Sequence, residues 1–106
     1  MLFRSGGLAL GNIGKIFLAT EVYLKALEFQ EKRLVLSAEI GDRLGEAKAL
    51  GDLGIVYQAL GEYQQAIESQ QKSLTLARTL QNSPAIALAL SNLQHIEIRL
   101  TIEGLE

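Results

Sequence analysis

The residues that most often carry chemistry are few in this chain and do not form a recognisable set. His95 is the only histidine and there is no cysteine, so neither a metal site nor a nucleophile–base pair can be assembled around it. The glycines of Gly11-Asn12-Ile13-Gly14 lack the lysine and the serine or threonine that complete a phosphate-binding loop. We therefore expect no catalytic residue, no metal and no cofactor, and we interpret His95 as a groove or surface residue.

The bulk composition excludes several classes of partner. The 106 residues include 10 basic and 12 acidic side chains, which offers no concentrated basic face for nucleic acid. The longest charge-free stretch, residues 79–96, is interrupted by polar side chains, so it does not read as a membrane span. With 48% hydrophobic residues, residues 1–106 can form one domain with its own core. We expect a cytoplasmic protein that binds neither nucleic acid nor membrane.

The most informative feature of the chain is an internal repeat of forty residues. Between residues 11–50 and 51–90, thirteen of forty positions are identical without a gap. A third, partial copy begins at Leu90. Such a period is typical of stacked helical repeats, which mostly bind other proteins. The identical positions of the first copy are Gly11, Gly14, Ala19, Tyr23, Ala26, Glu28, Gln30, Lys32, Leu34, Leu36, Ala47, Ala49 and Leu50.

Apolar residues recur at steps of three and four within each copy, and no alternating strand pattern is present, so we predict an all-α fold. Gly61 is expected to end one helix. Asp42 and Ser83 are expected to cap the next ones, with Pro84 in the first helical position. The predicted helices span residues 7–20, 22–39, 43–60, 63–80 and 84–102. They form repeat 1 (7–40), repeat 2 (43–80) and a partial repeat or capping helix (84–102).

The turn expected inside the first repeat has an alternative. Where the second repeat has Gly61, the first has Glu21, within the run Thr20-Glu21-Val22-Tyr23. None of these residues readily adopts a left-handed conformation. Residues 7–40 could therefore form one continuous helix of roughly 50 Å. Its apolar side would then be covered by the same element of a second chain.

The pattern Leu50-x2-Leu53-Gly54-x2-Tyr57, followed by Gly61, Tyr63 and Ala66, resembles the tetratricopeptide repeat. The first copy matches it with Leu10-x2-Ile13-Gly14-x2-Phe17, Tyr23 and Ala26. The family's usual period is about 34 residues, and armadillo and HEAT repeats have periods nearer forty. The forty-residue period is similar to that of a longer tetratricopeptide variety, and Gln30 and Gln70 stand where the family has an aromatic residue. The resemblance implies an α-solenoid of about two and a half hairpins that binds a peptide or helix in its concave groove, without catalysis.

In this family the first helix of each hairpin lines the groove. Carried over, the resemblance places in the groove Asn12, Asp52 and Asn92, then Lys15, Ile55 and His95, with Lys48 and Arg99 beside them. An asparagine side chain can donate to and accept from a peptide backbone at once. The alternative is that these residues form an ordinary solvated helix surface.

The last predicted helix is apolar on more than one face. Terminal repeats normally carry a polar outer face, so this surplus should be covered by missing repeats of a longer parent, a ligand helix or a second copy. We predict self-association as a dimer, with exchange of an element between the two chains as one route, through Leu88, Ile96, Ile98, Leu100 and Ile102. An alternative function follows, namely an oligomerisation module of a larger regulatory or signalling protein.

Overall fold

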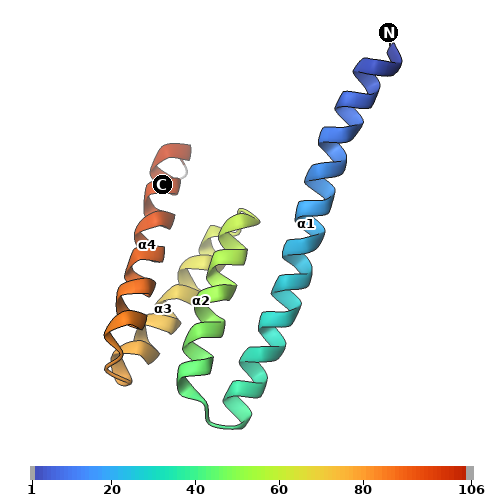
Figure 1. Cartoon of the computed structure of the whole chain (residues 1–106). Coiled ribbons are helices and arrows are strands. Elements are labelled where there is room, and N and C mark those ends of the chain that lie inside the picture. Colours follow the sequence, from blue (N-terminus) through green and yellow to red (C-terminus); the bar gives the residue numbers. More distant parts are fainter. Residues whose placement is uncertain (1, 105–106) are drawn as a thin grey trace.

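Four α-helices account for the chain in the computed structural model, which describes residues 2–104, with side chains from residue 19 onward (Figure 1). They are α1 (Leu2–Glu39), α2 (Arg43–Ala59), α3 (Tyr63–Thr79) and α4 (Ser83–Glu103). Residues 2–104 contain no strand, so the all-α prediction is confirmed. The prediction of five helices is wrong, because residues 7–20 and 22–39 belong to one helix. The alternative of a continuous first helix is the one observed.

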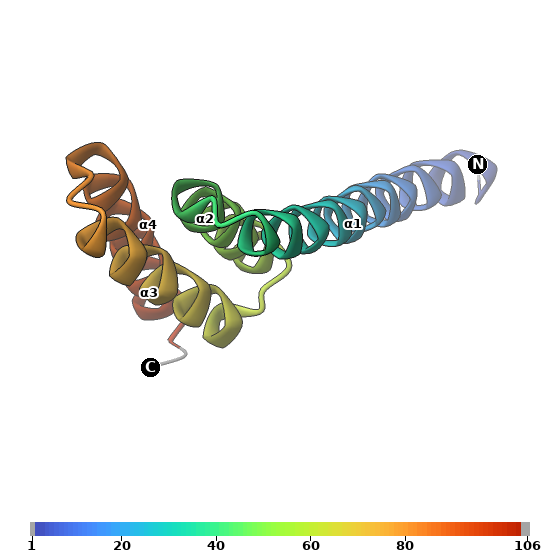
Figure 2. The same cartoon turned by 90° about the horizontal axis from the view of Figure 1, so that it is seen from below.

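Successive helices pack side by side and run in opposite directions. Helix α2 contacts α1, α3 and α4, and α3 contacts α4. Helix α1 is more than twice as long as α2 and projects well beyond it (Figure 1). Viewed from below, α3 and α4 lie on the side of α2 away from the projecting part of α1 (Figure 2). In the described part of the chain α1 therefore has one neighbour, α2, whereas α3 has two.

The three turns share one geometry at intervals of twenty residues. Gly41, Gly61 and Gln81 have positive φ angles of 74°, 80° and 55°. In each turn the next residue donates its backbone N–H to a carbonyl five residues earlier, as Asp42 does to Ser37 at 2.8 Å. This is the Schellman arrangement that ends a helix. Twenty residues before Gly41, where the same interval would place another turn, stands Glu21, which lies inside α1. It is followed by Val22, a residue that cannot cap a new helix.

Side-chain caps begin two of the helices. The carboxylate of Asp42 accepts a 2.9 Å hydrogen bond from the Gly45 N–H, which confirms the predicted cap of α2. For α4 the predicted cap, Ser83, is wrong, because Asn82 Oδ1 accepts a 3.0 Å hydrogen bond from the Ala85 N–H. Ser83 is the first helical residue instead, and Pro84 lies in the first turn, where its missing N–H costs nothing.

The core lies along α2 and the helices that flank it. Its buried apolar side chains are Ala47, Ala49, Leu50, Leu53, Val56, Ala66, Leu74, Ala77, Ala89 and Ile96. Half of them are alanine, so neighbouring helices can approach closely. Ile96 is fully buried, which corrects its assignment to a self-association surface: it packs inside the chain and is not accessible to a second copy.

Candidate binding groove

A cavity of about 250 Å³ opens between α2 and α4. Small-molecule sites usually measure about 300–1,000 Å³, so this cavity has room for a side chain rather than for a cofactor. Small residues one turn apart keep it open, Ala47 and Gly51 on α2 and Ala85 and Ala89 on α4. The remaining lining residues are Arg33, Lys48, Asp52, Ile55, Gln70, Ser73, Leu88 and Asn92.

The cavity brings together four of the eight residues expected in the groove, Lys48, Asp52, Ile55 and Asn92. Ile55 and Arg99 line a second, wider hollow near the C-terminal end of α2. His95 is exposed and lines neither hollow. The side chains of Asn12 and Lys15 lie outside the described residues. Leu88, expected to mediate self-association, forms part of the cavity wall and is exposed.

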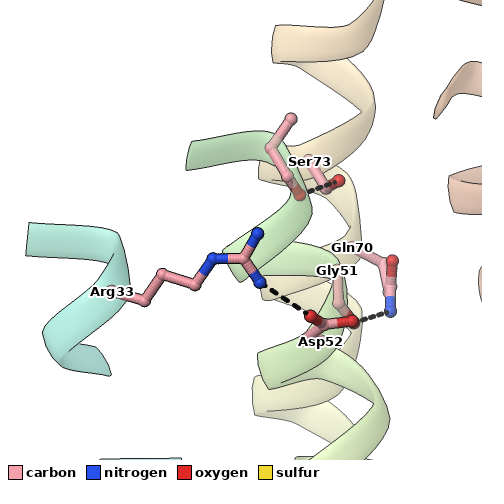
Figure 3. A network of polar contacts seen from close by, with 6 residues as sticks. Arg33, Gly51, Asp52, Gln70 and Ser73 are labelled. Carbon is pink, nitrogen blue, oxygen red and sulfur yellow. Dashed lines mark hydrogen bonds and ion pairs between the residues drawn. The ribbon is translucent and has the colours of Figure 1, made fainter. Parts of the chain in front are cut away.

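Two side chains of α3 fix the floor of the cavity by bonding to the α2 backbone (Figure 3). Gln70 Nε2 donates a 2.8 Å hydrogen bond to the carbonyl oxygen of Gly51. Ser73 Oγ donates a 2.7 Å hydrogen bond to the carbonyl oxygen of Ala47. Gln70 is fully buried and Ser73 nearly so, which makes these bonds costly to break.

Buried polar atoms without a partner also belong to the cavity wall. Within the described part of the chain, Gln70 Oε1 and Asn92 Nδ2 have no hydrogen-bond partner. A buried polar atom left unpaired costs about 1–3 kcal/mol. A ligand that supplied an acceptor for Asn92 Nδ2 would recover part of that cost.

Three charged side chains, those of Arg33, Lys48 and Asp52, form a rim at the apolar cavity. Arg33 of α1 reaches Asp52 of α2 at 3.4 Å (Figure 3). Because both side chains are about two-fifths exposed, the pair contributes well under 1 kcal/mol. Lys48 is exposed and has no ion pair among the residues whose side chains are described. Among the described side chains of this rim, Lys48 is therefore an unpaired cation, whereas the carboxylate of Asp52 is paired with Arg33.

The family model described as tetratricopeptide repeat matches residues 7–79, well over half of the chain. The chain belongs to the tetratricopeptide repeat family. No curated protein matches it. Tetratricopeptide repeats are in general non-catalytic modules for protein–protein interaction.

Seven lining residues of this tetratricopeptide repeat chain were not expected from its sequence, namely Arg33, Ala47, Gly51, Gln70, Ser73, Ala85 and Ala89. One signal was available. Gln30 and Gln70 are identical across the repeat and both replace an aromatic residue of the tetratricopeptide pattern. A polar residue retained at an expected core position indicates a specific hydrogen bond, and Gln70 makes one.

Two further findings concern the described part of this tetratricopeptide repeat chain. Among these residues no three histidine, cysteine, aspartate or glutamate side chains converge to hold a metal ion. None of the helices in this part is long and apolar enough to cross a membrane.

Proposed function

We propose that the cavity between α2 and α4 binds a peptide or helix of another protein and performs no catalysis. The observation that carries the proposal is the convergence of Asp52 and Asn92, one repeat apart in sequence, on a single apolar cavity. Asn92 supports it as well, because its buried Nδ2 lacks a partner and, with the side chain turned into the cavity, would donate to a peptide carbonyl.

The lining residues define the chemistry of the peptide. Leu88 and Ile55 are exposed apolar residues at the cavity, and they would enclose one apolar side chain of the ligand. Asn92 Nδ2 would donate to a backbone carbonyl beside that side chain. Lys48, the unpaired cation of the rim, favours an acidic residue nearby. The preferred motif is therefore one apolar residue with an acidic neighbour.

A displayed library of random peptides, selected against the whole chain, tests this preference. The selected sequences should share an apolar residue next to an aspartate or glutamate. For the best peptide, Asn92→Ala should weaken binding roughly three- to tenfold, and Leu88→Glu should weaken it further by placing a charge in the apolar wall. His95→Ala, outside the cavity, is the matched control and should change nothing. Peptides that bind equally well to all three variants would contradict the proposal.

A second candidate function is self-association through α4 as an oligomerisation module. Leu88, Ile98 and Ile102 are exposed, Ile102 to 73%, while Leu100 is half-buried. Leu88 and Ile102 lie four turns apart, hence on one side of the helix. Light scattering on an Ile98→Glu/Ile102→Glu variant tests this function. If α4 mediates self-association, the particles of the variant should have a lower mass than those of the wild type.

A further inference from the structure

Residues 23–39 of α1 are the forty-residue repeat of α3. The two segments share Tyr23 with Tyr63, Ala26 with Ala66, Gln30 with Gln70, Leu34 with Leu74 and Leu36 with Leu76. Helix α3 packs against the helix before it, α2, and the helix after it, α4. Helix α1 packs only against the helix after it, α2, in the described part of the chain. Helix α3 is therefore covered by a preceding helix, α2. Helix α1 has no preceding helix packed against it in the described part of the chain.

The face of α1 that lacks this contact is apolar. Val22, Phe29 and Leu36 are each more than half exposed, and their spacing of seven residues places them on one side of the helix. Phe29 is 66% exposed, whereas its counterpart on α3, Ser69, is 8% exposed. The middle of this exposed stripe therefore corresponds to a position that is covered on α3.

The sequence of the missing partner can be inferred from Gln70. On α3 this glutamine donates to the carbonyl of Gly51 and lies against Gly54. Its counterpart on α1, Gln30, makes no such side-chain hydrogen bond in the described part of the chain. Forty residues before Gly51 and Gly54 stand Gly11 and Gly14. The segment that fits residues 22–39 is therefore one with the sequence of residues 7–20.

We propose that a second copy of the chain supplies this segment, so that two α1 helices pair antiparallel in an exchanged dimer. Helix α1 runs straight through Glu21, which carries residues 7–20 away from residues 22–39 of the same chain (Figure 1). Pairing Gly11 of one copy with Gln30 of the other puts the two-fold axis near Glu21. The interface is then isologous, with the same surface contributed by both copies, and Val22 of one copy lies level with Ala19 of the other.

An engineered disulfide tests the register, and the absence of natural cysteines makes the result unambiguous. A Cβ atom at Gly54 would lie 2.9 Å from Gln70 Cγ, so cysteines at this pair of positions come within disulfide reach. The variant Gly14→Cys/Gln30→Cys should therefore oxidise to a covalent dimer with two interchain disulfides. In the control Gly14→Cys/Lys32→Cys, the second cysteine replaces an exposed side chain two residues from Gln30, hence on the opposite side of the helix from it, and no covalent dimer should accumulate.

A hinge variant tests the exchange itself. Glu21→Gly/Val22→Asp copies the turn residues Gly41-Asp42 of this chain, which end one helix and cap the next. Residues 7–20 should then fold back onto residues 22–39 of their own chain. Light scattering should show a shift from dimer to monomer, and the Gly14→Cys/Gln30→Cys pair should close within one chain. Glu28→Gly is the control, which loosens α1 without offering a turn at the hinge and should stay dimeric.

Phe29→Asp separates this interface from association through α4. Because Phe29 is largely exposed in the single chain, the variant should keep its helical circular dichroism and become monomeric. Ile102→Glu, on α4, should remain dimeric. The proposal is overturned if the wild-type chain is monomeric, or if Gly14→Cys/Gln30→Cys closes within one chain while the native hinge is present. A dimer that resists Phe29→Asp but dissociates with Ile102→Glu overturns it as well.

Discussion

The side chain of Gln70 lies against the backbone of Gly54, where α3 packs on α2. A Cβ atom at Gly54 would come 2.5 Å from Gln70 Nε2 and 2.9 Å from Gln70 Cγ. Gln70 cannot easily move aside, because it is fully buried and its Nε2 is hydrogen-bonded to Gly51. The glutamine and the glycine are therefore a matched pair, and both recur forty residues earlier as Gln30 and Gly14.

Gly54→Ala should destabilise the fold for this reason. The added methyl group overpacks the interface, and we expect a loss of about 1–3 kcal/mol in the free energy of unfolding. Gly51→Ala, in the same helix, is the control. Its Cβ would lie 3.6 Å from Ser73 Oγ, an ordinary contact, so the better helix propensity of alanine should stabilise the chain by up to about 1 kcal/mol. Urea unfolding followed by circular dichroism measures both, and equal effects would argue against the pairing.

Gln81→Gly should stabilise the chain. Gln81 occupies the left-handed position that glycine holds in the other two turns, with a φ angle of 55°. A side chain in this conformation costs about 1–2 kcal/mol, part of which glycine gives back through the entropy of the unfolded chain. We expect a net gain of roughly 0.5–1 kcal/mol. The reverse exchange, Gly61→Gln, should produce a loss of similar size. Thermal unfolding tests both variants, because the melting temperature should rise for Gln81→Gly and fall for Gly61→Gln.

Asn82→Ala should weaken the start of α4. Removing a side-chain cap costs about 0.5–2 kcal/mol, and Asn82 supplies the hydrogen bond to the Ala85 N–H. Ser83→Ala should stay within about 0.5 kcal/mol of the wild type, since the Ser83 side chain is exposed. Unfolding midpoints distinguish the two positions. If Ser83→Ala proved the more harmful change, serine would be the true cap in solution.

The elements with strong local signals could be predicted from sequence. The bounds of α2 and α3 differ from the expected ones by a single residue, because Gly41, Asp42 and Gly61 mark their ends. The cap of α4 could not be decided, since asparagine and serine are both good caps and proline is tolerated in the first turn after either. The sequence around Glu21 was compatible with both a turn and a continuous helix. Tertiary packing, rather than propensity, selects between such alternatives.

Only those residues of the candidate groove that follow from the forty-residue repeat could be predicted from the sequence. Asp52 and Asn92 line one cavity because the forty-residue period places them at equivalent positions of neighbouring hairpins. Arg33 reaches Asp52 from a different helix, a contact set by how α1 packs on α2, which no local pattern encodes. Leu88 was assigned to another surface because α4 is apolar on several faces. Its periodicity alone therefore cannot separate the side that lines the cavity from the side that faces solvent.

Tyr57 should make stability depend on pH in the alkaline range. Burial, and then the nearby carboxylates of Glu31 and Glu62, raise the pKa of the Tyr57 phenol above its ordinary value of 10.0. Below pH 10.0 the phenol is neutral in both folded and unfolded chains. As the pH rises further, the unfolded chain loses this proton first, so the free energy of unfolding should fall until the folded-state pKa is passed.

Tyr57→Phe isolates the contribution of this phenol to the pH dependence of stability. Phenylalanine keeps the ring but has no proton to lose, so the decline of the unfolding free energy above pH 10.0 should be shallower in the variant. Glu31→Gln removes one of the two carboxylates and should give an intermediate slope. Urea unfolding at a series of alkaline pH values measures all three proteins. Identical slopes for Tyr57→Phe and the wild type would mean that the phenol ionises equally readily in both states.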